Sequence, residues 1–190
     1  MSRRRAQTGM SGAEIAVIVF VAVMAFWILG AHNRLVRLRQ AIKAAFAQVD
    51  AQLRQRHELL GELIAAVEEG KAEPPQTLVA VEAARQQARV AADRVLLKPG
   101  SSGRMASLVL AEQVLRRAVE GLEQLVAVQP ALGDEARLRE SMAELDALQH
   151  RLHAARAAFN AEATAYNASI RQFPTRVVAE LFGFRAAGLL

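Results

Sequence analysis

An uncharged apolar run near the start of the chain, from Ile15 to Ala31, most constrains what this sequence can fold into. As a helix, its roughly 17 residues span about 26 Å, and with tolerant flanks the run covers a hydrocarbon core of about 30 Å. Trp27 falls near one end, where an indole suits the headgroup level. A cleavable signal peptide also starts with basic residues, but this run is long for one and lacks a good cleavage site. We therefore expect a transmembrane anchor over residues 12–33, after a basic, disordered N-terminus over residues 1–11.

The charges that flank the run leave the side of the membrane open. Basic residues lie on both sides of it, namely Arg3, Arg4 and Arg5 before it and Arg34, Arg37, Arg39 and Lys43 after it. The positive-inside rule compares the two sides, and here they are nearly balanced. We expect a single-pass protein with the lipid bilayer as one partner, its soluble part lying on an undecided side.

The composition favours long helices and makes some classes of function improbable. Hydrophobic residues make up 53% of the chain, but only seven Phe, one Trp and one Tyr are among them. Gly and Pro are few outside short clusters, a balance typical of helices. Without cysteine there are no disulfides and no thiolate metal sites. The net charge is +5, but Arg alternates with Glu and Asp instead of gathering on one face, so no nucleic-acid partner is expected.

After the anchor, apolar residues recur at steps of three and four, which predicts amphipathic helices. The expected helices cover about residues 34–69, 76–97, 104–128 and 135–173. Clusters of Pro and Gly separate them. The fold class is therefore all-α: a single transmembrane helix continuous with a long antiparallel four-helix bundle, or coiled-coil-like soluble domain, over residues 34–174.

The unequal helix lengths predict how the bundle stands on the membrane. The first and last helices are the longer pair, so we expect a two-helix stalk near the bilayer and four helices only farther away. The apolar tail over residues 175–190 should then lie at the membrane interface or under the bundle. In the first helix the apolar stripe is interrupted at Arg56 and His57. A buried arginine needs a partner, unless its head group extends to solvent.

Three stretches place polar residues at fixed helical positions: His32–Arg39, Val49–Leu60, and Arg151–Asn160 continuing to Tyr166-Asn167 and Phe173-Pro174. They resemble motifs of the LemA family of membrane-anchored helical proteins, Tyr-Asn-x-Leu-Val-x-Leu-Arg, Ile-Asp-x-Gln-Leu-x-Arg-Arg-x-Asp-Leu-Ile and Arg-Ile-Ala-x-Ala-Arg-x-x-Tyr-Asn. The chain departs from these motifs at His32, Gln55 and Phe159, and directly after the second one Gly61 and Glu62 replace a family proline and asparagine. The resemblance implies a divergent member with a helical bundle behind an anchor in the bacterial inner (cytoplasmic) membrane, and it implies no established enzymatic activity.

The antiparallel register of the two long helices predicts a polar layer between them. It brings Arg156 level with about Gln52, so we expect an Asp50–Arg156 ion pair with Asn160 and Asn167 hydrogen-bonded nearby. Such a layer either fixes helix register or forms a site for partner binding or sensing. Its expected members are Asn33, Arg39, Asp50, Gln52, Arg56, Arg151, Arg156, Asn160, Tyr166 and Asn167.

No pattern in the sequence predicts chemistry. His150 and His153 lie one turn apart near Asp146, but on the outer face and without a second ligand cluster. A phosphate-binding Gly-rich loop, G-x-S-x-G, H-E-x-x-H and Glu-x-x-His are all missing. We expect no catalytic residue, metal or cofactor, and hence no enzyme. The expected function is a scaffold or interaction module that binds another membrane or membrane-associated protein. The alternative is a membrane-tethered sensor or signalling component of a stress response that acts through a partner.

Overall fold

The computed structural model describes residues 11–68, 75–128 and 135–190, and within them the chain forms five α-helices and no strand. They are α1 (Gly12–Glu68), α2 (Gln76–Leu96), α3 (Ser102–Val128), α4 (Glu135–Arg171) and α5 (Thr175–Leu181). The prediction of an all-α fold is thus confirmed. The disorder expected of the N-terminal segment with its three arginines, and the loop residues expected at 70–74 and 130–134, lie outside the described residues.

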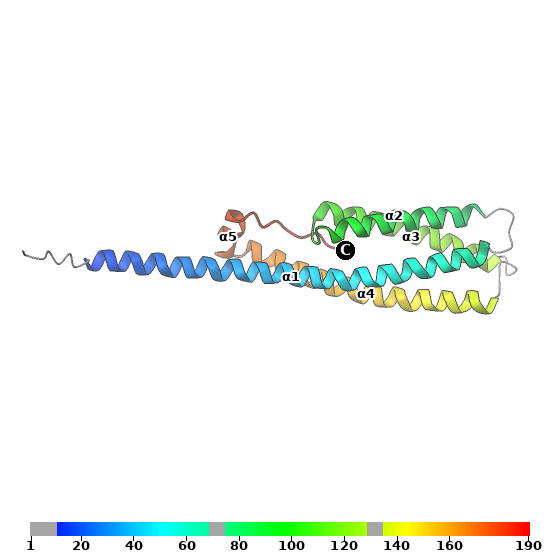
Figure 1. Ribbon diagram of the computed structural model, residues 1–190, viewed down its shortest axis with the longest axis horizontal. Coiled ribbons are helices and arrows are strands. Elements are labelled where there is room, and N and C mark those ends of the chain that lie inside the picture. Colours follow the sequence, from blue (N-terminus) through cyan, green and yellow to red (C-terminus); the bar gives the residue numbers. More distant parts are fainter. Residues whose placement is uncertain (1–10, 69–74, 129–134) are drawn as a thin grey trace, which may run out of the picture.

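Helix α1 is a single uninterrupted helix of 57 residues, about 85 Å long. It begins with a capping box, in which the Ser11 N–H donates to Glu14 Oε2 at 2.9 Å and the Glu14 N–H donates to Ser11 Oγ at 3.3 Å. Its N-terminal part extends beyond every other helix of the structure (Figure 1). By length and composition α1 could cross a membrane, a test that signal sequences near an N-terminus also pass.

The four long helices pack as two pairs. Helix α4 runs along α1, and α2 and α3 form a hairpin that lies against the distal half of this pair (Figure 1). Apart from the start of α1, every end of these four helices lies within two residues of the expected position. The apolar stripe of α1 is buried as its spacing predicted: Leu35, Ile42, Phe46, Val49, Leu53, Leu60, Ile64 and Val67 are core residues, and Leu38 is half-buried. Across the pair, Phe46 and Phe159 meet edge to face, with ring centroids 5.9 Å apart.

The C-terminal segment corrects the expectation of a bare two-helix stalk. After α4 the chain forms α5, which was not predicted, at the end of the bundle nearest the apolar part of α1 (Figure 1). The chain then reverses at Gly183, where φ is +68°, a conformation that favours glycine. The rest of the tail runs back beside α4 as an extended segment and ends near the α2–α3 loop. The part of the tail after Gly183 therefore lies under the α2–α3 hairpin, one of the two places expected for the tail.

Aromatic side chains hold this segment against α1. His32 lies 4.7 Å from the ring centroid of Phe182 and 5.6 Å from that of Phe184. The guanidinium carbon of Arg39 lies 5.1 Å from the centroid of the Phe184 ring, a cation–π contact. These contacts fix α5 at the level where α1 leaves its fully exposed apolar part and enters the packed pair.

Candidate functional site

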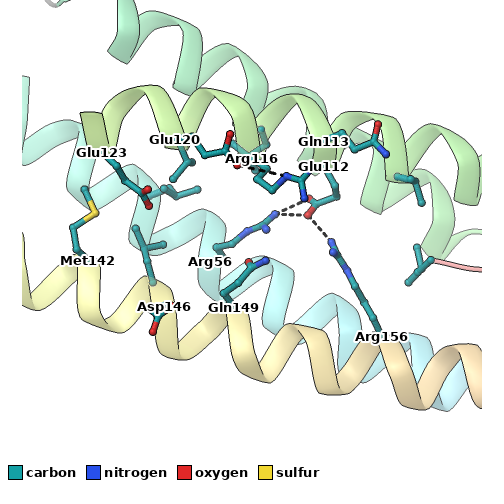
Figure 2. Close-up of a pocket in the computed structure, with 16 residues that line it drawn as sticks. Arg56, Glu112, Gln113, Arg116, Glu120, Glu123, Met142, Asp146, Gln149 and Arg156 are labelled. Atoms are coloured by element: carbon teal, nitrogen blue, oxygen red, sulfur yellow. Dashed lines mark hydrogen bonds and ion pairs between the residues drawn. The ribbon is translucent and has the colours of Figure 1, made fainter. Parts of the chain in front are cut away.

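Three charged side chains from three helices meet in the middle of the bundle. The Nη2 atom of Arg56 on α1 donates to both carboxylate oxygens of Glu112 on α3, each at 2.6 Å. The Nη2 atom of Arg156 on α4 donates to Oε2 of the same carboxylate at 2.7 Å. Figure 2 shows both arginines directed at Glu112 from opposite sides. Arg56 is 8% exposed and Glu112 7%.

The sequence places all three charges on apolar stripes, so helix packing forces them inward. Arg56 lies between Leu53 and Leu60 on α1, Glu112 between Leu108 and Leu115 on α3, and Arg156 between Leu152 and Phe159 on α4; all six apolar neighbours are buried. A buried charge is tolerated only when it is paired. One carboxylate serves two guanidiniums here, so the cluster carries a net charge of +1 from two Arg and one Glu.

The cluster replaces the predicted Asp50–Arg156 ion pair, which is wrong. Asp50 pairs instead with Arg54, one turn along the same helix, at 2.7 Å from Oδ2 to Nε. Arg54 also reaches Asp93 of α2 at 3.3 Å, so this pair lies toward α2 and away from α4. The register argument compared α1 with α4 only, whereas the carboxylate that Arg156 binds comes from α3. Burial lowers the pKa of Arg156 and Glu112 opposes this, yet a guanidinium remains charged at any physiological pH.

Sequence reasoning missed Glu112, although a signal for it was present. Leu108 and Leu115 are both core positions seven residues apart, and Glu112 fills the intermediate stripe position. A carboxylate at such a position on an otherwise apolar face indicates a buried cationic partner. Arg56 was recognised as a charge that interrupts the apolar stripe of α1, but it was not predicted to pair with Glu112.

The predicted asparagines bind the C-terminal segment and take no part in the ion cluster. Asn160 donates from Nδ2 to the main-chain oxygen of Leu190 at 2.7 Å and accepts from the Leu190 N–H at 2.8 Å. Asn167 makes the same pair of bonds with Ala187, at 2.9 and 2.7 Å. The Tyr166 hydroxyl, in a buried side chain, donates to the main-chain oxygen of Arg185 at 3.0 Å. Burial is the main cause that raises the pKa of Tyr166.

The remaining members of the predicted layer are scattered. Asn33 and Arg151 are exposed, and Arg151 donates from Nε to the Ala147 carbonyl at 3.4 Å. Arg39 is exposed and lies over Phe184, while Gln52 is half-buried, with an Oε1 atom that has no partner among the described residues. The structure thus divides the expected single layer into an ion cluster, a set of side chains that bind the tail, and surface residues.

His57 is a buried polar residue whose state the sequence could not give. It is 3% exposed, and neither ring nitrogen has a hydrogen-bond partner in the part of the chain that the structure describes. Burial, with the neighbouring Arg56 charge next in importance, lowers its pKa from 6.5 to about 4. The imidazole is therefore neutral at pH 7.

A cavity of about 450 Å³ opens beside the ion cluster, between α3 and α4. Its wall is apolar at Leu60, Leu115, Met142 and Leu145, and the cluster closes one end (Figure 2). Acidic side chains line another part of it, including Glu123 and Asp146. No nucleophile stands beside a base in this cavity, and the described residues contain no group of three metal-ligating side chains. The cavity thus joins an apolar wall to charged side chains at its edges.

Comparison with known protein families gave a match that covers most of the chain. A model of the LemA family matches residues 45–190, which include α1 from Ala45 onward and all of α2 to α5. No protein of curated function matches the chain. The family match spans the ion cluster, the cavity and the tail with its asparagines.

Proposed function

Because the chain belongs to the LemA family, we propose that it is a non-enzymatic helical bundle, anchored in the bacterial inner membrane, that binds another membrane or membrane-associated protein. The proposal has two parts, the anchor and the interaction role, and a different observation supports each. The carrying observation is the exposed apolar part of α1.

The N-terminal part of α1 is far too apolar to be stable in water. Large side chains along it are between 39% and 76% exposed, among them Ile15, Phe20, Val23, Met24, Phe26 and Leu29. Burial of each such side chain is worth about 1.5–3 kcal/mol, so a continuous surface of them requires an apolar environment. A lipid bilayer supplies it along the whole stretch, and the helix has the length to cross one.

Helix α5 supports the same placement independently of α1. Phe173 before it is 80% exposed, and Val177, Leu181 and Phe182 are each more than half exposed. His32, just past the apolar stretch, packs against Phe182, so these side chains lie where α1 would emerge from the hydrocarbon. Exposed Arg171 and Arg176 stand beside them. Apolar side chains flanked by arginines suit the headgroup region.

The interaction role is favoured by what the bundle offers. The charges in its interior are used in pairing, and the cavity between α3 and α4 combines an apolar wall with polar ends. Such a groove can receive an apolar side chain or helix from a partner. This supports binding rather than catalysis as the use of the soluble part.

Tryptophan quenching tests both levels of the membrane placement in full-length protein reconstituted into liposomes with brominated lipids. Wild-type Trp27 should be strongly quenched. A Trp27→Phe background carrying Leu181→Trp should be quenched by bromine near the headgroups, whereas the matched control, Val79→Trp at the far end of α2, should not. If Trp27 is unquenched and alkaline carbonate releases the protein, the anchor proposal fails.

In-membrane cross-linking followed by mass spectrometry tests the partner: a bundle that cross-links to no other protein would argue against the interaction role.

A further inference from the structure

A second cavity, of about 690 Å³, lies on the anchor side of the α2–α3 hairpin. Its walls come from three parts of the chain that are distant in sequence: α1, the loop between α2 and α3, and the C-terminal segment after α5. Figure 1 shows that loop and that segment on the same side of α1. On α1 the lining residues include His32, Val36, Arg39 and Lys43, whose steps of four, three and four place them on one helix face.

Among the described residues that line this cavity, every Lys, Arg, Asp or Glu side chain is basic. The four are Arg39 and Lys43 of α1, Lys98 of the α2–α3 loop and Arg185 of the C-terminal segment. None of them forms an ion pair within the part of the chain that the structure describes. The cavity beside the ion cluster, by contrast, is lined by side chains of both signs. Like charges that surround one cavity repel one another, and a bound anion offsets this repulsion.

Neutral hydrogen-bond donors lie at the same cavity. Ser101 and Ser102 line it, and each hydroxyl is able to donate. Ser102 is also the first residue of α3, a helix of 27 residues. The start of a helix carries a partial positive charge and N–H groups that have no partner inside the helix. These groups add to the attraction that the four basic side chains exert on an anion.

Contacts between the three walls shape the cavity in the absence of a ligand. The Gly188 N–H donates to the Gly100 carbonyl at 3.0 Å, which joins the C-terminal segment to the α2–α3 loop. A Cβ atom at Gly100 would lie 3.5 Å from Cβ of Ala187 and 3.6 Å from Cγ2 of Ile42, so the loop lies directly against both other walls. Arg39 is placed by its contact with the Phe184 ring. A site formed before binding loses less entropy when its ligand binds.

We propose that this cavity is a binding site for the phosphate group of an anionic phosphate ester. The basic side chains neutralise the charge of the phosphate, and the serine hydroxyls donate to its oxygens. Donors reach the cavity from three walls, an arrangement that suits the tetrahedral oxygens of a phosphate better than the two coplanar oxygens of a carboxylate. Arginine and lysine are also the side chains that bind phosphate most often, the first by paired hydrogen bonds and the second as a point charge.

Two kinds of molecule carry such a group, a phospholipid and a soluble phosphate ester. The lipid source rests on the proposed anchor, which brings the edge of the cavity at His32 to the headgroup region. Arg39 lies seven residues farther along α1, or about 10 Å. The Cα–Cβ bonds of a helix tilt toward its N-terminus, so Arg39 and Lys43 leave the helix toward the membrane. A lipid phosphate would enter past Phe182, whose exposed ring suits the start of the acyl chains.

Titration of full-length protein in a neutral detergent tests the site and distinguishes the two sources. The soluble probe is sn-glycerol 3-phosphate, followed by isothermal titration calorimetry with glycerol as its uncharged control. The lipid probe is phosphatidylglycerol, whose bound fraction is measured by native mass spectrometry, with phosphatidylcholine of the same acyl chains as the control without net charge. At least one anionic probe should bind about tenfold or more tightly than its control, and the probe that does so identifies the source.

The Lys43→Gln/Lys98→Gln variant identifies the cavity as the place of binding. Both side chains are exposed and form no hydrogen bond or ion pair within the described residues, so the urea midpoint should not change. One basic residue is worth about fivefold in affinity for an anionic lipid surface, so the double variant should bind at least about tenfold more weakly. The matched control is Arg34→Gln/Arg37→Gln, which removes two exposed charges from the same part of α1 but outside the cavity. Its affinity should stay within about twofold of wild type at physiological salt.

Two outcomes would overturn the inference. One is that neither anionic probe binds better than its control. The other is an equal loss in the two double variants, which would show a general attraction between a basic surface and an anion. Because both titrations are made in detergent, they do not depend on whether α1 crosses a membrane. Protein that binds a probe through Lys43 and Lys98, yet is released from vesicles by alkaline carbonate, keeps this site and loses the anchor. Protein that stays in the membrane and binds neither probe loses only the site.

Discussion

Glu112→Gln is the substitution that most directly tests the organisation of the bundle interior. It keeps the size of the side chain but removes the negative charge that Arg56 and Arg156 share. Two positively charged guanidiniums then face a neutral amide, and its NH₂ group cannot accept a hydrogen bond from either of them. Arg56 cannot reach solvent easily, since its side chain is only 10% exposed.

The expected loss can be placed within a range. Removal of one partner of a buried ion pair costs about 3–5 kcal/mol. The Arg156 side chain is 29% exposed and the adjoining cavity can admit water, so screening brings the loss toward about 3 kcal/mol. For a domain whose total stability is about 5–15 kcal/mol, this is a large part.

Urea unfolding in detergent, followed by circular dichroism, measures it. At a slope of about 2 kcal/mol per molar urea, the midpoint should fall by about 1.5 M. The matched control is Glu123→Gln on the same helix and the same cavity but exposed, which should stay within about 0.5 kcal/mol of wild type.

A double-mutant cycle separates the pair from other effects of the substitution. Combining Glu112→Gln with Arg56→Met removes the more deeply buried of the two unpaired cations, so the double variant should lose at least about 1 kcal/mol less than the two single losses added together. If Glu112→Gln is as stable as its control, or if the two losses simply add, the cluster does not hold the three helices together as described.

Three further predictions each concern one residue, namely His57, Asp50 and Asn167. The folded chain lowers the pKa of His57 from 6.5 to about 4, so the unfolded chain binds this proton more tightly. The contribution of neutral His57 to the free energy of unfolding should be complete above pH 6.5 and fall by at most about 3 kcal/mol as the pH drops to about 4. Urea midpoints at each pH measure this loss, and the part due to His57 should vanish in His57→Leu. Asp50→Asn should cost less than about 1 kcal/mol, because Asp50 is buried but its partner Arg54 is half exposed, so solvent screens the pair, and Asn keeps the shape of the side chain; a loss above about 2 kcal/mol would contradict this screening. Asn167→Ala should cost about 1–2 kcal/mol in the same assay and raise hydrogen exchange at Ala187, while exchange at Leu53 stays unchanged.

The architecture followed from periodicity, because core formation in a helical bundle depends mainly on where apolar residues recur. The stripe from Leu35 to Val67 needed only the 3.6-residue period to be found. Helix α5 has seven residues directly after Pro174, too few for a period to register. The local sequence therefore does not predict so short a helix, because its stability comes from the packing of Val178 and Ala179 against the rest of the protein.

The site was only partly predictable, for two separate reasons. Glu112 comes from a third helix, and spacing within one helix cannot say which neighbour a charged side chain will face. Asn160 and Asn167 were recognised as important, yet their partners are main-chain atoms, and every residue has those. The side chains therefore show that Asn160 and Asn167 bind something, but they do not show that it is the main chain of the C-terminal segment.

The uninterrupted course of α1 makes this molecule a lever. About 55 Å of helix separates Ala31 from Glu68, and the described helix contains no break at which a bend could be absorbed. Anchored helices answer a change of bilayer thickness by tilting. A tilt of about 10° at the membrane would carry the far end of the bundle sideways by about 10 Å. If α1 is anchored as proposed, lipid thickness would thus set how far the distal end reaches across the membrane surface.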